Sequence, residues 1–251
     1  MISLFTNSWK LNNIEAILFD KDGTLQNDHI YWGKLAENRI KEIIKHFNLD
    51  ENFFEELCIK IGYNPNDMKL IKNGPVGTLS RTEVVEFMVR ELQNYNVKTD
   101  FDEISQIFDK VNKIFLSDIT PYVFFLPGAK NFLDEIKKKN IKMGLVTSDS
   151  TVNAHKILEI LQIDNYFDCV IGKDSCDEDK KTGKPAVIAM QKLNSNPSNT
   201  IAIGDAPMDY SMAEKAGLKG CILVATGQVD IANLEVLSKY CAQNLDEVKI
   251  K

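Results

Sequence analysis

The order of hydrophobic and polar residues divides the chain into stretches of different periodicity. Residues 1–13 are polar and rich in asparagine, without a clear period, and predict an irregular extension. Residues 16–19 form an uninterrupted apolar run, which is typical of a short strand buried on both faces. From residue 26 to about residue 126, apolar residues recur at helical spacing instead. The pattern therefore predicts a first strand followed directly by a helical insert.

Four helices are expected in this insert. Apolar residues at helical spacing mark the first over residues 32–47, and the second starts after Asp50 and stops at Gly62. The third opens with a capping box, Ser-Arg-Thr-Glu, at residues 80–83. The fourth carries its apolar face over residues 104–115. No convincing alternating strand interrupts them, so the insert is expected to be all helical.

From Pro127 onward the pattern alternates between helices and strands. Strands are expected at residues 142–146, 169–171, 200–203 and 221–224, with a final strand and helix near residues 240–248. Such alternation predicts a parallel sheet with helices on both faces. The expected fold class is therefore α/β, a doubly wound parallel sheet with a smaller all-helical domain. The expected domains are an α/β core of residues 14–25 and 127–251, a helical domain of residues 26–126, and the extension of residues 1–13.

Distinctive polar residues follow these strands at their carboxyl ends. Asp20 and Asp22 follow the first strand, Thr147 and Ser148 follow the second, and Asp205 follows the fourth. In open parallel sheets, ligands bind outside the carboxyl ends of the strands. Two carboxylates as close as Asp20 and Asp22 repel each other unless a cation lies between them. The sequence therefore predicts a phosphate-transfer centre at this edge of the sheet.

Composition narrows the class of protein further. The 251 residues carry a formal net charge of −6, which gives no sign of a nucleic-acid-binding surface. Five cysteines are scattered without a C-x-x-C pair, as in a protein with reduced thiols. Residues 1–10 lack the apolar region of a signal peptide, and no apolar run approaches the roughly 20 residues that span a bilayer. We expect a cytoplasmic protein without membrane or nucleic-acid partners; the sequence does not indicate its oligomeric state.

The motifs at the strand ends resemble those of haloacid-dehalogenase-like (HAD) phosphohydrolases. The resemblance is to the phosphoglycolate-phosphatase-like kind, which carries a helical cap after the first strand of a Rossmann-like core. The four family motifs fall at Asp20-Lys21-Asp22-Gly23-Thr24, at Thr147 or Ser148, at Lys184, and at Gly204-Asp205-x-x-x-Asp209. The resemblance covers nearly the whole chain from Ile14. It implies a phosphatase that hydrolyses a small phosphorylated metabolite with Mg²⁺ as its cofactor.

The resemblance also implies a role for each carboxylate. Asp20 is expected to attack phosphorus and form an aspartyl-phosphate, as an ionised and oriented carboxylate can. Asp22 is expected to act first as general acid and then as general base, and to give its backbone carbonyl to the metal. Asp205 is expected to be the second metal carboxylate. Asp209 would bind the metal directly, bind it through water, or orient the other ligands.

Groups that bind the phosphate are implied as well. Thr147 or Ser148 would donate a hydroxyl group and an N–H to a phosphate oxygen, because a loop before a helix N-terminus suits an anion. Lys184, in Lys-Thr-Gly-Lys-Pro, would offset the charge of the nucleophile and the phosphoryl group. Lys180 and Lys181 are nearby competitors for this role.

Lys21 and Arg81 lie outside the roles described so far. Lys21 occupies a position that many relatives fill with an apolar residue, and its side chain is expected to point away from both aspartates if the segment stays extended. Arg81 is the expected cap contact for a substrate anion. A phosphomutase on the same scaffold stays an alternative, because its cap must hold a second phosphate. A non-catalytic HAD-like binding protein is the other alternative, although the motif aspartates are all present.

Overall fold

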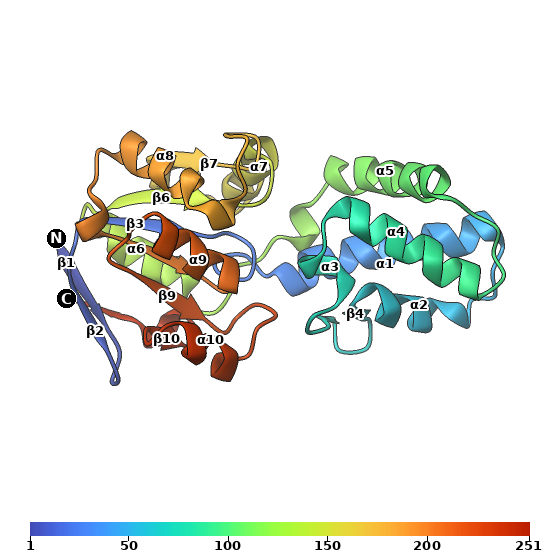
Figure 1. Ribbon diagram of the computed structural model, residues 1–251, viewed down its shortest axis with the longest axis horizontal. Coiled ribbons are helices and arrows are strands. Elements are labelled where there is room, and N and C mark those ends of the chain that lie inside the picture. The colour runs from blue at the N-terminus through green and yellow to red at the C-terminus, as the bar shows by residue number, and fades with distance from the viewer. The chain divides into compact units, whose positions relative to one another are not determined.

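The computed structural model describes residues 1–251 and divides into two compact units. One unit contains Met1–Asn27 and Phe124–Lys251, and the other contains Asp28–Val123 (Figure 1). The chain therefore leaves the first unit once, shortly after its first core strand, and returns once. None of the helices combines the length and the apolar character needed to cross a membrane.

The first unit is built on a six-stranded parallel sheet. Its strands, in spatial order β10-β9-β8-β3-β6-β7, are β10 (Cys241–Ala242), β9 (Gly220–Val224), β8 (Thr200–Gly204), β3 (Ala16–Phe19), β6 (Lys142–Val146) and β7 (Cys169–Ile171). β3 lies between β6 and β8, with Ala16 opposite Lys142 on one side and Thr200 on the other. Every residue of β3 is buried, as a central strand covered on both faces requires. The predicted doubly wound parallel sheet is confirmed.

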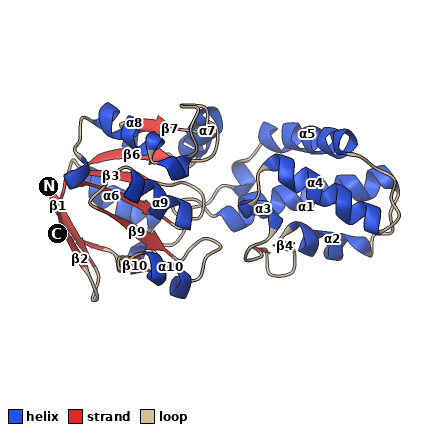
Figure 2. Ribbon diagram, in the orientation of Figure 1, coloured by secondary structure: helices blue, strands red, loops and turns tan.

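Helices pack on both faces of this sheet (Figure 2). They are α6 (Ala129–Lys138), α7 (Thr151–Ile160), α8 (Lys184–Leu193), α9 (Pro207–Lys215) and α10 (Ile231–Leu237), with short 3-10 turns between some of them. Leu18 belongs to the cluster that contains Ala189 of α8 and Met212 of α9. Phe19, its neighbour, packs its ring against Phe132 of α6 at a centroid distance of 6.2 Å. Successive β3 side chains thus fill the core on opposite faces.

Residues 1–13 do not form the irregular extension that the sequence predicts. β1 (Ile2–Phe5) and β2 (Lys10–Ile14) pair antiparallel, and β1 also pairs with β11 (Lys249–Ile250) near the other end of the chain. Leu4 and Leu11 are buried, and the Trp9 indole N–H donates to the Cys241 carbonyl at 2.8 Å. Because β1 also pairs with residues more than 200 positions away, no local pattern could indicate this part of the sheet.

The second unit is helical around one apolar cluster. Its helices are α1 (Asp28–Phe47), α2 (Phe53–Ile61), α3 (Pro75–Thr78), α4 (Arg81–Asn94) and α5 (Phe101–Ser117). The sequence pattern did not predict the small antiparallel hairpin formed by the two-residue strands β4 (Tyr63–Asn64) and β5 (Lys69–Leu70). The capping box before α4 is present: Ser80 accepts from the Glu83 N–H, and Glu83 accepts from the Ser80 N–H.

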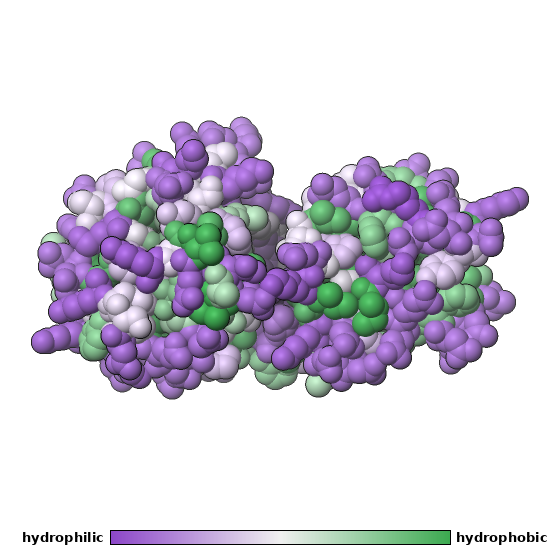
Figure 3. All heavy atoms as spheres, turned by 60° about the horizontal axis from the view of Figure 1, so that its bottom comes forward, coloured by the Kyte–Doolittle hydropathy of each residue, from purple (hydrophilic) through white to green (hydrophobic).

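On the face shown in Figure 3, hydrophobic residues form small separate patches on a largely hydrophilic surface, which is ordinary for globular proteins.

Candidate active site

A tight turn follows β3 and carries the first motif. The Asp20 N–H donates to the Ile203 carbonyl at 2.9 Å, so the chain is still held against β8 at this residue. The N–H groups of Leu25 and Gln26 then both donate to the Lys21 carbonyl at 2.9 Å, which closes the turn. Gly23 has a φ of +78°, and a Cβ there would lie 2.5 Å from an Asp205 carboxylate oxygen. Only glycine meets both conditions without strain.

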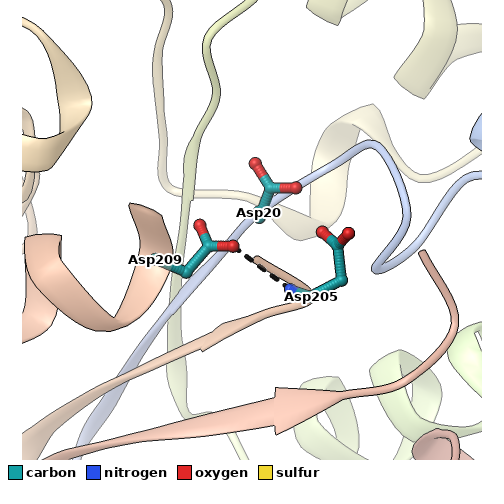
Figure 4. Close-up of side chains that lie close together, drawn as sticks. All are labelled: Asp20, Asp205 and Asp209. Carbon is teal, nitrogen blue, oxygen red and sulfur yellow. Dashed lines mark hydrogen bonds between the residues drawn. The ribbon is translucent and has the colours of Figure 1, made fainter. Parts of the chain in front are cut away.

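Three buried carboxylates meet beside this turn: Asp20 after β3, Asp205 after β8 and Asp209 in the first turn of α9 (Figure 4). One oxygen from each lies within 4.8 Å of the others. Oδ2 of Asp209 accepts from the main-chain N–H of Asp205 at 3.1 Å and of Ala206 at 3.0 Å. These bonds fix the Asp209 carboxylate at the start of its helix. The spacing of the last sequence motif thus brings its two aspartates to Asp20.

Lys180, not Lys184, carries a positive charge to this cluster. Its Nζ lies 2.5 Å from Oδ1 of Asp20 and 2.6 Å from Oδ1 of Asp209, and its side chain is buried. Lys184 is exposed. The Lys-Pro pair does mark the start of α8, but the 3-10 turn Lys180–Thr182 precedes it and turns the earlier lysine inward. The site lysine therefore lies one turn before the position that the sequence favours.

Burial and neighbouring charges shift the pKa values of this cluster. Burial raises the pKa of Asp20 to about 7; Lys180 opposes this change, whereas Asp209 and Asp22 add to it. Burial lowers the pKa of Lys180, but the carboxylates of Asp20 and Asp209 outweigh burial and raise it above its usual range. Burial also raises the pKa of Asp22, against the opposing effect of Lys21. Asp22 is thus a carboxyl group able to retain a proton, as a general acid requires.

The three-carboxylate cluster fits a hard divalent cation. When ionised, the three groups carry −3 and Lys180 carries +1, which leaves a formal charge of −2 in a buried site. Oxygen ligands of this kind suit Mg²⁺. Both oxygens of Asp209 are engaged, Oδ2 by two main-chain N–H groups and Oδ1 by Lys180, whereas Lys180 contacts only Oδ1 of Asp20, so Asp209 is better placed to orient the site. Asp20 and Asp205 are left as the carboxylates that would hold the ion.

The loop after β9 completes this site, and sequence reasoning missed it. The Thr226 hydroxyl donates to the Gly23 carbonyl at 2.6 Å. A Cβ at Gly227 would lie 1.8 Å from Oδ2 of Asp205, so the backbone of Gly227 lies directly against that carboxylate. A lone Thr-Gly pair has no motif by which it could have been recognised. The apolar strand just before it, at a sheet edge known to bind ligands, was the one available signal.

Thr147 and Ser148 lie in the loop after β6, as expected, but in different surroundings. The Thr147 side chain is buried, its N–H donates to Ile171, and its hydroxyl accepts from the Asp149 N–H at 3.2 Å. Ser148 is exposed, and its hydroxyl donates to the sulfur of Met208 at 3.4 Å. Both hydroxyl groups stay candidates for a phosphate oxygen.

Lys21 does not point away from Asp22, contrary to the sequence expectation. Its side chain is fully buried, and its Nζ lies 2.8 and 2.9 Å from the two carboxylate oxygens of Asp22. Oδ2 of Asp149 lies 3.3 Å from the same nitrogen, and Oε1 of Gln26 lies 3.4 Å from it. The expectation assumed an extended segment, whereas the chain turns at Lys21.

Arg81, at the start of α4, has partners within the helical unit. Its Nη2 donates to the Asp109 carboxylate at 2.6 Å and to the Ser105 carbonyl at 3.1 Å. Both side chains of the Arg81–Asp109 pair are exposed, so the pair is a weak one. The anion that faces Arg81 here is thus a carboxylate of α5, and the structure adds no support for a second phosphate site at this residue.

Comparison with known proteins identifies the family of this chain. A sequence model of the haloacid dehalogenase-like hydrolases matches residues 14–217. The pyrophosphatase PpaX of Oceanobacillus iheyensis is 26% identical over 209 residues, which cover 82% of each protein. The phosphoglycolate phosphatase of Aquifex aeolicus is 26% identical over 207 residues, or 82% of this chain and 83% of the relative. The structure of a beta-phosphoglucomutase from Clostridium difficile has a TM-score of 0.60 and 24% identity, covering 93% of this chain and 92% of its own.

The parallel sheet and the aspartates at its carboxyl edge define an α/β protein with a candidate metal site at that edge. The chain belongs to the haloacid dehalogenase-like hydrolase family, whose sequence model spans most of its length. The resemblance drawn from the motifs is confirmed, and the chain is an enzyme. The likeness to the phosphoglucomutase structure, at 24% identity, shows the fold alone.

Proposed function

We propose that this enzyme is a Mg²⁺-dependent phosphatase that hydrolyses a small phosphomonoester through an aspartyl-phosphate on Asp20. One observation carries the proposal: the Asp20 carboxylate is paired with buried Lys180 and grouped with the carboxylates of Asp205 and Asp209. A nucleophile needs orientation, and the attacked phosphoryl group needs positive charge around it. The names of the relatives, a pyrophosphatase and a phosphoglycolate phosphatase, support phosphoryl transfer to water.

In the first proposed step, an Asp20 oxygen bonds to phosphorus while the bond from phosphorus to the leaving oxygen breaks. Asp22 gives its proton to that oxygen, so the alcohol leaves neutral. In the second step a water oxygen attacks the phosphorus of the aspartyl-phosphate, Asp22 takes the proton of the water, and Asp20 is released as a carboxylate. Lys180 stabilises the negative charge throughout, since it lies beside Asp20.

Other groups complete the proposed site. Mg²⁺, held by Asp20, Asp205 and the Asp22 carbonyl, would neutralise phosphate charge so that an anionic nucleophile can approach. Thr147 and Ser148, in the loop before α7, are the proposed donors to a phosphate oxygen. We assign the substrate to small phosphorylated metabolites and the enzyme to the cytoplasm, where its five free cysteines would stay reduced.

The test is hydrolysis of p-nitrophenyl phosphate, with and without Mg²⁺, by the wild type and by Asp20→Asn. Activity should depend on the metal and be lost in the variant, with the fold intact by circular dichroism. Borohydride reduction of enzyme quenched during turnover should convert Asp20 to homoserine, detectable by mass spectrometry, because the acyl-phosphate is reducible. Full activity of Asp20→Asn would refute the assignment of the nucleophile. A panel of phosphorylated metabolites, including inorganic pyrophosphate and hexose phosphates, would then identify the substrate and reveal any mutase activity.

A further inference from the structure

We propose that Lys21 is a positioning residue for this reaction: its ammonium group fixes the Asp22 carboxyl group in place for proton transfer and ties it to the loop after β6. The proposal rests on the proposed function, in which Asp22 passes the proton. Lys21 lies between the two motif aspartates in the sequence, and the mechanism above gives it no role. Lys21 is positioned to act through Asp22, not on the substrate.

Two carboxylates and one amide oxygen lie around the ammonium group of Lys21. An ammonium group has three N–H bonds. Around Nζ of Lys21 lie the carboxylate of Asp22 at 2.8 Å, the carboxylate of Asp149 at 3.3 Å and the amide oxygen of Gln26 at 3.4 Å. The lysine is fully buried, so these groups take the place of water. A buried ammonium with matched acceptors has little freedom to reorient, and it restricts the carboxylate to which it is bound.

Asp149 is itself firmly held, which gives Lys21 a fixed anchor. Its Oδ1 accepts from the Ser150 N–H at 2.7 Å, and its Oδ2 accepts from the Asn153 side chain at 2.5 Å. Its own N–H donates to the Thr147 hydroxyl at 3.2 Å. A continuous series of contacts thus runs from Asp22 through Lys21 and Asp149 to Thr147. The proposed proton donor and a proposed phosphate donor are held by the same series.

Removing Lys21 alone would leave two carboxylates, Asp22 and Asp149, close together without the cation between them. Removing one member of a buried ion pair is far more disruptive than replacing both members with neutral groups. The pair Lys21 and Asp149 should therefore behave as a unit in a double-mutant cycle. A lysine that only filled space would show no such coupling to Asp149.

The kinetic test compares two esters that differ in their need for a proton donor. Phenyl phosphate has a poor leaving group and needs protonation, whereas 2,4-dinitrophenyl phosphate has a good one and does not. Lys21→Met should lower kcat for phenyl phosphate by about tenfold or more, and for the dinitrophenyl ester by less than about threefold. KM should change little for either ester. Lys192→Met, an exposed lysine of α8, is the matched control and should behave as wild type.

Two more variants test whether the charge of Lys21 is what matters. Lys21→Met/Asp149→Asn removes one positive and one negative charge, and should fold at least as well as Lys21→Met. Lys21→Arg should recover part of the phenyl phosphate activity, since it restores a cation beside Asp22. Equal losses for the two esters in the variants that fold, or strict additivity of the two substitutions, would overturn the proposal.

Crystal structures of the wild type and the Lys21→Met protein give a readout that is independent of catalysis. The Asp22 carboxyl group should leave its wild-type position in the variant. An unmoved Asp22 overturns the positioning role, whether or not the esters are hydrolysed. Absence of wild-type hydrolysis of every ester, together with a displaced Asp22 in the variant, would instead reject the proposed function and retain the positioning contact.

Discussion

Nζ of Lys180 lies 2.5 Å from a carboxylate oxygen of Asp20, inside the α/β unit and shielded from water. This pair predicts different consequences for two lysines only four positions apart. Lys180→Met should lower kcat by at least about 100-fold, because it removes a preorganised charge from the reacting group. Lys184→Met, at an exposed position, should change kcat by less than about twofold. Steady-state kinetics with p-nitrophenyl phosphate decide between them, and the reverse order of effects would restore Lys184 to the site.

Mg²⁺ is expected to stabilise the protein more at about pH 8 than at about pH 6. The pKa of Asp20 is raised from 3.8 to about 7, so at the lower pH a bound cation must displace a proton. Because the folded protein binds the Asp20 proton more tightly than the unfolded chain does, protonation of Asp20 favours the folded state. This stabilisation is complete below the pKa of the unfolded state and is lost as the pH rises through the pKa of the folded state. The metal-free protein should therefore lose stability between about pH 4 and about pH 7.

Thermal unfolding over this pH range, with and without Mg²⁺, measures both effects. Below the pKa of Asp20 the apparent affinity for the metal should fall by about tenfold per pH unit if one proton is displaced. Asp20→Asn serves as the control, since its pH dependence should be flatter and its response to Mg²⁺ weaker. An equal Mg²⁺-induced shift of Tm at both pH values would contradict the role given to Asp20.

Gly227→Ala should weaken metal binding although no side chain at this position faces a ligand. The new Cβ would lie 1.8 Å from an Asp205 carboxylate oxygen, so the carboxylate or the loop must move. The Mg²⁺-induced rise in Tm should largely disappear, and kcat should fall with it. Gly217→Ala is the matched control, because its Cβ would meet no atom within 4 Å. That control costs some stability through its positive φ but should leave the Mg²⁺ response intact.

Leu4→Ala should destabilise the protein by about 2–5 kcal/mol, because the Leu4 side chain on β1 is fully buried. The expected loss is in the free energy of unfolding, measured in urea, with kcat preserved within about twofold. Lys10→Ala, at an exposed position of β2, should change stability by less than about 0.5 kcal/mol. Equal, small effects of both substitutions would mean that β1 and β2 are not part of the folded core in solution.

Some of this architecture could be predicted from the sequence because its causes are local. The apolar run of β3 and the aspartates that follow it are adjacent in the chain, and the alternation of strands and helices indicates a parallel sheet directly. The convergence of Asp20 and Asp205 follows from the rule that parallel strands end at one edge.

The features that sequence reasoning missed have causes that the periodicity of apolar residues does not contain. β1 pairs with the far end of the chain, so its partner is invisible in its own composition. The direction of the Lys180 side chain depends on a 3-10 turn, whereas the Lys-Pro pair at the start of α8 favours Lys184 in the sequence. The direction of Lys21 depends on a turn whose closing bonds come from Leu25 and Gln26. Gly227 matters only because another strand brings Asp205 to it.

The contact of Lys21 with Asp22 and Asp149 also has an evolutionary consequence. Replacing Lys21 alone would leave the carboxylates of Asp22 and Asp149 without the cation between them, whereas replacing Asp149 alone leaves Lys21 paired with Asp22. Positions 21 and 149 should therefore covary among homologues. A sequence with an apolar residue at the position of Lys21 should have a residue other than aspartate or glutamate at the position of Asp149. Homologues with a lysine at position 21 would then form a separate group with their own version of this active site.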